Sequence, residues 1–184
     1  MRLFIAVNIP AQVKDRIGDI QHGLIQSQAD VKWVEKDNLH LTLRFIGDTL
    51  DDKPLLIAAA LEPKLKGFGS FEIVLSGMGA FPDMNFPRII WAGVEDMSGK
   101  LRELVLIIEE SLLKLGFEGE AREFTPHLTI GRVRWQKSIS NLKAVIQQKS
   151  EYDPVPFQIS SVDIMESVLT PQGPIYKCLN SIIV

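Results

Sequence analysis

The stretch Leu39–Phe45, which reads Leu-His-Leu-Thr-Leu-Arg-Phe, has an apolar residue at every second position. Because a β-strand sends alternate side chains to opposite faces, this alternation predicts a strand whose four apolar residues, Phe45 included, face a core. The side chains of His40, Thr42 and Arg44 then lie together on the other face. The strand thus presents an imidazole, a hydroxyl and a guanidinium to one side.

A second stretch, Pro126–Ile130, repeats this pattern, with His127 and Thr129 in phase with each other. The two His-x-Thr motifs start 87 residues apart (127 − 40). One such motif is weak evidence, because short motifs also match by chance. Two copies in predicted strands are strong evidence that both histidines and both threonines belong to one functional site.

The rest of the chain alternates predicted strands and helices. The spacing of apolar residues predicts helices over 10–24, 52–65, 101–112 and 138–148, and strands over 3–8, 31–34, 39–46, 71–75, 88–94, 126–133, 155–168 and 175–183. A shift of 87 residues brings elements onto elements of the same kind, which indicates an internal duplication. Because a strand begins near residues 3, 88 and 175, we expect residues 1–184 to form a single bilobal domain in which the chain crosses between lobes.

The composition is that of a folded protein with a substantial core. The 184 residues are 46% hydrophobic with a net charge of −3, and no apolar run is long enough to span a bilayer. This charge argues against a large sequence-independent nucleic-acid surface, which needs many contacts to phosphates. A nucleic acid would therefore be held locally, at one phosphate.

Cys178 is the only cysteine, so no internal disulfide can form. Its apolar neighbours predict a small buried strand residue rather than a nucleophile. The apolar start, Leu3–Asn8, has no small-residue cleavage site and is better explained as a first strand than as a signal peptide. A reducing cytoplasm is the expected compartment.

Paired histidines suit displacement at phosphorus. That reaction needs a base on the attacking oxygen and an acid on the leaving oxygen, on opposite sides of the phosphorus atom. An imidazole, with an unperturbed pKa near ~6.5, can serve as either at neutral pH. The hydroxyls of Thr42 and Thr129 can donate hydrogen bonds to the non-bridging oxygens, where negative charge gathers. Two imidazoles on opposite sides of the phosphate fit this task without a metal ion.

Other sites are less well supported. A metal site would need more ligands, and the third histidine, His22, is predicted on the surface of a helix. The sequence lacks the Gly-x-Ser-x-Gly elbow of a serine hydrolase. Gly67–Ser70 and Ser76–Gly79 are explained as turns rather than as phosphate loops. The three tryptophans could stack on a base, but packing in a core or between lobes is favoured for each: Trp33, Trp91 and Trp135.

The chain resembles the two-histidine phosphoesterase superfamily, and within it the bacterial and archaeal RNA 2′,3′-cyclic phosphodiesterases, historically called 2′-5′ RNA ligases. The resemblance spans nearly the whole chain and rests on Arg2–Val7, Asn38–Gly47, Arg88–Gly93, Phe124–Arg132 and Gly173–Tyr176. It implies an α+β fold with two antiparallel sheets, flanked by helices, around a central cleft.

The resemblance also implies an activity and a set of roles. The enzyme would open RNA 2′,3′-cyclic phosphate ends to 2′-phosphates, without metal or cofactor, and could run in reverse as a 2′-5′ ligase. His40 would be the proton donor and His127 the proton acceptor, an order that the nearly symmetric motifs do not themselves decide. A 2′,5′-oligonucleotide phosphodiesterase and a non-catalytic RNA-end binding module remain alternatives. A monomer is expected.

The contribution of the arginines is left open by the sequence. Arg44 lies in phase with its motif and could reach the phosphate or the RNA backbone, or be a solvated charge at a strand end. In the second motif the equivalent position is Gly131, and the charge appears one residue later, at Arg132. Arg132 needs a bend at Gly131 to enter the cleft, and Arg134 could compete for the role.

Overall fold

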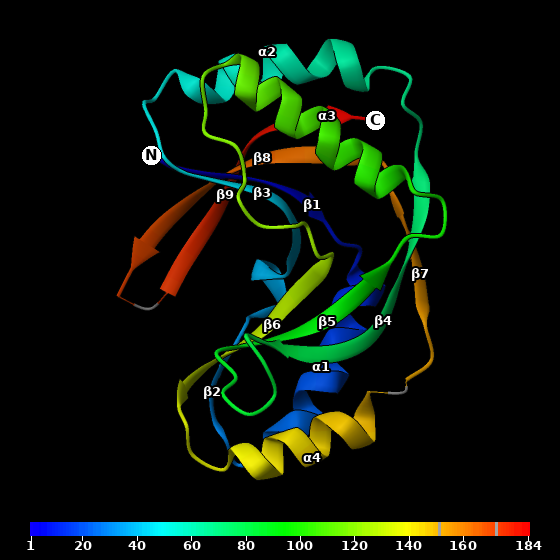
Figure 1. Ribbon diagram of the computed structural model, residues 1–184, viewed down its shortest axis with the longest axis vertical. Helices are drawn as coiled ribbons and strands as arrows, with labels where there is room; N and C mark the ends of the chain where they lie inside the picture. Colours follow the sequence, from blue (N-terminus) through cyan, green and yellow to red (C-terminus); the bar gives the residue numbers. More distant parts are fainter. Residues whose placement is uncertain (151, 172) are drawn as a thin grey trace.

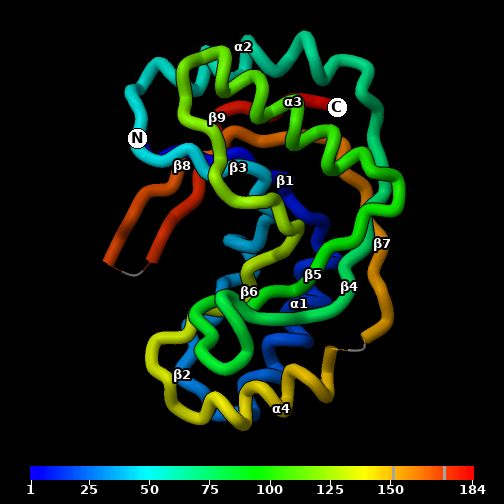
Figure 2. The backbone as a smooth tube through the Cα atoms, viewed as in Figure 1, coloured from blue at the N-terminus to red at the C-terminus, as the bar shows by residue number. Residues whose placement is uncertain are grey.

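The computed structural model describes residues 1–150, 152–171 and 173–184 (Figures 1 and 2). Within these residues lie nine strands, four α-helices and one 3₁₀ helix, so the predicted α+β class is confirmed. In chain order the elements are β1 (Arg2–Asn8), α1 (Ala11–Ile25), β2 (Asp30–Trp33), η1 (Lys36–Asn38), β3 (His40–Asp48), α2 (Lys53–Leu65), β4 (Phe71–Phe81), β5 (Ile89–Glu95), α3 (Lys100–Lys114), β6 (His127–Trp135), α4 (Ile139–Lys149), β7 (Val155–Ile159), β8 (Ser161–Thr170) and β9 (Gly173–Ile183).

The strands form one hydrogen-bonded sheet, which corrects the expectation of two separate sheets. The order is β7-β4-β5-β6-β3-β1-β8-β9, and β2 pairs with β6 outside this path. The connection between the two halves is narrow, because β3 and β6 are joined by the single residue pair Leu41–Leu128. We refer to β3, β1, β8 and β9 as the β1 half, and to β7, β4, β5, β6 and β2 as the β5 half.

Two helices cover each half of the sheet (Figure 1). Helices α2 and α3 contact each other and pack on β9 and β3, whereas α1 contacts α4 and β6. Helix α1 therefore follows β1 but lies on the β5 half, and α3 follows β5 but lies on the β1 half. Each of these two helices buries its apolar residues at helical spacing, Val13, Ile17, Ile20 and Leu24 in α1 and Leu101, Leu104, Ile108 and Leu112 in α3.

Strand β4 is longer than predicted, because Ser76–Gly79 lies within it and is not a turn. The pairing of β4 with β5 shifts between Leu75 and Met78, so the strand accommodates these residues as a bulge. Gly77 has a φ of +70° at this point. The glycines that suggest a turn in the sequence are thus what a bulged strand requires.

The predicted strand over 155–168 is in fact two strands that serve different halves of the sheet. Strand β7 pairs with β4, and β8 pairs with β1 and β9. Cys178 in β9 is exposed rather than buried, which corrects the prediction made for it. Because β9 is the edge strand of the sheet, part of its surface stays open to solvent.

Candidate active site

The junction between the halves brings the two His-x-Thr motifs together. Leu41 and Leu128 are fully buried and pair across antiparallel strands. This register sets His40 opposite Thr129 and, by the same geometry, Thr42 opposite the second histidine. All four polar side chains leave the sheet on the face away from the two leucines, which we call the cleft face; the opposite face is the helix face.

Both histidines are oriented by a backbone carbonyl two residues earlier. The Nδ1 atom of His40 lies 2.8 Å from the carbonyl oxygen of Asn38, and that of His127 lies 2.6 Å from the carbonyl oxygen of Thr125. A carbonyl oxygen can only accept a hydrogen bond, so each Nδ1 carries a hydrogen. In both rings, Nε2 is therefore the atom left to take up or release a proton.

The His40 ring packs against two aromatic rings. Phe4 from β1 and Tyr176 from β9 each lie 4.9 Å from it between ring centroids, Tyr176 edge-on. Burial raises the pKa of the Tyr176 phenol, an effect that the positive charges of Arg132 and Arg2 oppose, so the side chain stays neutral. The rings restrict the orientation of the imidazole in addition to its carbonyl bond.

His127 also packs against two aromatic rings, and we call the two rings around each histidine its aromatic seat. The ring of Phe81 lies edge-on at 5.0 Å and that of Trp91 at 6.4 Å. Trp91 lies flat over Gly79, where a Cβ atom would come within 2.3 Å of the indole. Sequence reasoning missed both seats. One signal was available, because Trp91 and Phe4 are separated by the same 87 residues as the motifs.

A bulge in β3 turns Arg44 away from the cleft. Thr42 pairs with Ala6 and Arg44 with Ile5, so Leu43 is the extra residue. Since Ala6 and Ile5 are adjacent in β1, they point to opposite faces, and so do their partners. Arg44 therefore lies on the helix face, contrary to the alternation read from the sequence.

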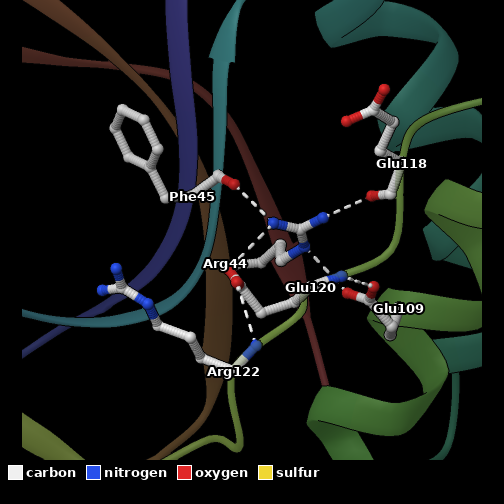
Figure 3. A network of polar contacts seen from close by, with 6 residues as sticks. All are labelled: Arg44, Phe45, Glu109, Glu118, Glu120 and Arg122. Carbon is white, nitrogen blue, oxygen red and sulfur yellow. Dashed lines mark hydrogen bonds and ion pairs between the residues drawn. The ribbon is translucent and has the colours of Figure 1, made fainter.

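On that face the Arg44 guanidinium is held by four groups (Figure 3). Its Nε donates to the Glu109 carboxylate at 2.8 Å and its Nη1 to that of Glu120 at 3.1 Å. Further bonds go to the carbonyl oxygens of Phe45, at 2.7 Å, and Glu118, at 2.5 Å. Only 11% of the Arg44 side chain is exposed. The structure thus gives Arg44 a role in joining β3 to α3 and does not bring it to the motif.

The same bulge explains why Phe45 is not in the core. Phe45 pairs with Phe4, whose ring lies on the cleft face, and 44% of Phe45 is exposed. The Arg2 guanidinium lies 5.1 Å from the centre of the Phe45 ring. The predicted core position is therefore wrong, because the extra residue Leu43 reverses the alternation beyond it.

An equivalent bulge in β6 brings Arg132 into the cleft. Thr129 pairs with Trp91 and Arg132 with Ile89, with Ile130 as the extra residue. Trp91 and Ile89 are two residues apart and point to the same face, so Thr129 and Arg132 do as well. Arg132 needs an irregularity in the strand to reach the cleft. The structure contains one, the bulge at Ile130, one position before Gly131.

A pocket of about 440 Å³ opens on the His40 side of the junction. Its walls include His40, Thr42, Thr129 and Arg132, together with residues of β2 and of the β8–β9 hairpin. His127 and Arg44 are not among the residues that line it. The two halves of the site therefore differ, since His40 lines this pocket and His127 does not.

The environment of His40 favours its neutral form. Burial lowers the pKa of His40 below its ordinary value of 6.5, and the positive charges of Arg132 and Lys14 lower it further, while the bond to Asn38 acts in the opposite direction. In the free protein at neutral pH, Nε2 is therefore largely unprotonated and able to accept a hydrogen bond.

A titration can test this account. We expect the His40 Cε1–H resonance to titrate with a midpoint below 6.5 in the free protein, and Arg132→Gln to raise that midpoint because a nearby positive charge is removed. His22→Gln, on the exposed side of α1, serves as the matched control and identifies one competing signal. A midpoint that does not move in Arg132→Gln would show that the guanidinium does not act on this ring.

Two further properties concern the described residues as a whole. In this part of the chain, no group of three or more histidine, cysteine, aspartate or glutamate side chains is placed to hold a metal ion. None of the described helices combines the length and the apolar character needed to cross a membrane.

Comparison with known proteins agrees with this geometry. Residues 9–170 match the family model of the 2′-5′ RNA ligase superfamily. The RNA 2′,3′-cyclic phosphodiesterase of Methanocaldococcus jannaschii is 36% identical over 97% of this chain and 98% of its own, and that of Methanothermobacter thermautotrophicus is 35% identical over 96% and 95%.

Solved structures show the same fold. TT0787 of Thermus thermophilus superposes with a TM-score of 0.81 at 25% identity, covering 100% of this chain and 97% of its own. Escherichia coli LigT, in a complex with 3′-AMP, gives a TM-score of 0.77 at 20% identity with the same coverage. The resemblance inferred from the motifs is confirmed, and the chain belongs to the 2′-5′ RNA ligase superfamily.

Proposed function

We propose that this protein hydrolyses 2′,3′-cyclic phosphodiester ends of RNA to 2′-phosphomonoesters. The observation that carries the proposal is the junction itself, where two histidines with the same carbonyl-fixed tautomer lie beside two threonines on one sheet face. Relatives about 35% identical over almost their whole length are named RNA 2′,3′-cyclic phosphodiesterases. RNA ends are thus the partner that the site supports best.

In the proposed reaction, Nε2 of His127 takes a proton from water, whose oxygen forms a bond to phosphorus. The bond from phosphorus to O3′ breaks, and Nε2 of His40 gives a proton to that oxygen. The products are a 2′-phosphomonoester and a free 3′-hydroxyl, and one water molecule is consumed. The hydroxyls of Thr42 and Thr129 stabilise the charge on the non-bridging oxygens. Run in the same direction with an RNA 5′-hydroxyl in place of water, these steps form a 2′-5′ bond and release O3′ as a hydroxyl.

The assignment of His40 as donor requires its protonated form, although its surroundings disfavour that form in the free protein. A bound phosphodiester carries a negative charge beside the ring, and an opposite charge at this distance raises the pKa of an imidazole. Substrate binding therefore raises the pKa of His40 and favours the protonated ring that the donor role requires.

Product analysis tests the function. We expect an oligoribonucleotide with a 2′,3′-cyclic end to yield only a 2′-phosphate, at an unchanged rate after treatment with a chelator. Phosphorus NMR distinguishes this product from a 3′-phosphate, which would require the opposite leaving group. Chelator inhibition that a divalent ion reverses would instead point to a metal-dependent reaction.

The same assay separates the alternatives. A binding module would protect the cyclic end without turnover, and a 2′,5′-oligonucleotide phosphodiesterase would cleave internal 2′-5′ linkages and leave the cyclic end intact. Both motifs keep the complete His and Thr set in one site, which supports catalysis over simple capture.

The proposal extends to the architecture: a single bilobal domain formed by internal duplication, with the cleft between lobes. Reversing the strand order exchanges β3 with β6 and β1 with β5, and in each pair the two strands begin 87 residues apart. The crossed helices α1 and α3 exchange in the same way. Both bulges repeat accordingly, at Leu43 and Ile130, and so do the rings of Phe4 and Trp91; Tyr176 in β9 and Phe81 in β4 lie in strands that do not exchange with each other. A monomer is proposed as the working state, and the free, exposed Cys178 suits the cytoplasm.

A further inference from the structure

Trp135, the last residue of β6, is the most exposed of the three tryptophans. Its exposed fraction is 73%, whereas Trp91 packs against Phe81 and His127, and Trp33 is half-buried. Trp135 therefore does not pack in the core or between the lobes, and the packing role predicted for it is wrong. Exposure of one aromatic residue is not by itself a site, so its position on the sheet decides its meaning.

The strand register places Trp135 on the cleft face. Trp135 pairs with Asp30 in β2, and Arg132 pairs with Lys32. The pairing shifts between these points, so Arg134 is an extra residue in β6. Because Asp30 and Lys32 are two residues apart, they point to the same face, and their partners Trp135 and Arg132 do so too.

The cleft face of β6 thus presents a line of side chains that leads away from the junction. Thr129, Arg132 and Trp135 follow one another, each separated from the next by a bulge. Counting each bulged pair as one step, the strand carries Trp135 about 13 Å from Thr129. Trp135 does not line the pocket that holds His40. It is therefore placed for a part of the substrate beyond the nucleotide whose phosphate reacts.

Positive charge accompanies this line. Arg132, Arg134 and Lys137 lie within six residues of one another, and none makes a salt bridge within the described part of the chain. On the paired strand β2, Lys32 adds a positive charge opposite Arg132 and Asp30 a negative charge opposite Trp135. These segments of β2 and β6 therefore keep an excess of positive charge, beside which a phosphate backbone can run. Cations along a backbone with an aromatic side chain for a base are the combination that holds single-stranded nucleic acid.

We propose that Trp135 is a stacking platform for a base on the 5′ side of the cyclic-phosphate nucleotide, so that the enzyme selects single-stranded RNA ends over mononucleotides. The inference rests on the proposed function and adds the substrate class to it. Base–aromatic stacking tolerates any base, and splayed single-stranded ends expose bases for such contacts. Selection by Trp135 is thus by chain length and not by sequence.

The test compares uridine 2′,3′-cyclic phosphate with a tetrauridylate that ends in the same cyclic phosphate. We expect Trp135→Ala to raise the KM for the tetranucleotide about tenfold, the effect of losing one stacked base, and to leave the KM and kcat for the mononucleotide unchanged. Trp135→Phe should keep most of the affinity for the tetranucleotide. Leu106→Ala, which removes another exposed apolar side chain, on α3, is the matched control and should alter neither substrate.

The inference fails if Trp135→Ala leaves the tetranucleotide KM unchanged, or if it weakens both substrates equally. If the wild-type protein hydrolyses neither substrate, the proposed function fails instead. Binding then still decides the question: the tetranucleotide should quench tryptophan fluorescence more strongly in the wild type than in Trp135→Phe, which keeps only the quenching of Trp33, in the pocket lining, and of Trp91. Equal quenching in both proteins would overturn the platform.

Discussion

Replacing either of the two histidines proposed as acid and base with alanine is expected to lower kcat for an RNA 2′,3′-cyclic phosphate by about 10²–10⁴-fold, the usual contribution of a positioned acid or base. The loss should appear in kcat more than in KM, because proton transfer stabilises the transition state and not the bound substrate. Single-turnover hydrolysis of an end-labelled oligonucleotide measures it directly for His40→Ala and His127→Ala.

The structure supplies a matched control for these variants. His22 lies on the exposed side of α1, so His22→Ala should keep full activity. Thermal unfolding of all three variants should stay near the wild-type temperature, since neither motif histidine is a core residue. Full activity in His40→Ala or in His127→Ala would contradict the paired acid–base mechanism.

The second large effect is expected in stability. Arg44→Ala leaves the Glu109 carboxylate, whose side chain is 22% exposed, without its cation, and it also removes hydrogen bonds to the carbonyl oxygens of Phe45 and Glu118. Breaking a largely buried pair from one side costs about 3 kcal/mol. For a chain of this size, that loss lowers Tm by roughly 6–12 °C. Calorimetry measures the shift.

For Arg132→Ala we expect the opposite of Arg44→Ala, with a loss of substrate binding and not of stability. The Arg132 side chain lines the pocket and is exposed, so its removal should leave Tm unchanged and weaken substrate binding. The two arginines thus exchange the roles that strand alternation assigns to them. An Arg44→Ala variant with unchanged Tm and a raised KM would contradict this account and return Arg44 to the cleft. Arg44→Lys should recover only part of the stability, since lysine lacks the forked geometry.

Much of the site was readable from local patterns. Alternation in Leu39–Phe45 and Pro126–Ile130 predicted that His40 and His127 share a face with their threonines, and the 87-residue spacing linked the two strands. Both inferences depend only on the two-residue period of a strand. The helices were equally readable, because each carries its own apolar stripe.

The errors share a different cause. Bulges at Leu43 and Ile130 depend on how β3 and β6 pair with their neighbours, and no period within one strand reports this. The same holds for Ser76–Gly79, where glycines that resemble a turn accommodate a bulge and the ring of Trp91. The aromatic seats of the histidines were missed because their members come from four different strands.

The sequence by itself predicted which four polar side chains lie together on one sheet face, and it determined which family the chain resembles. Each of these depends on periods and motifs contained within short segments. Only the tertiary structure decided that a single residue pair joins the halves into one sheet, that Arg132 and not Arg44 enters the cleft, and that His40 lines the pocket while His127 does not. Those outcomes depend on register and packing between strands far apart in the chain, where one extra residue reverses the face to which every later side chain points.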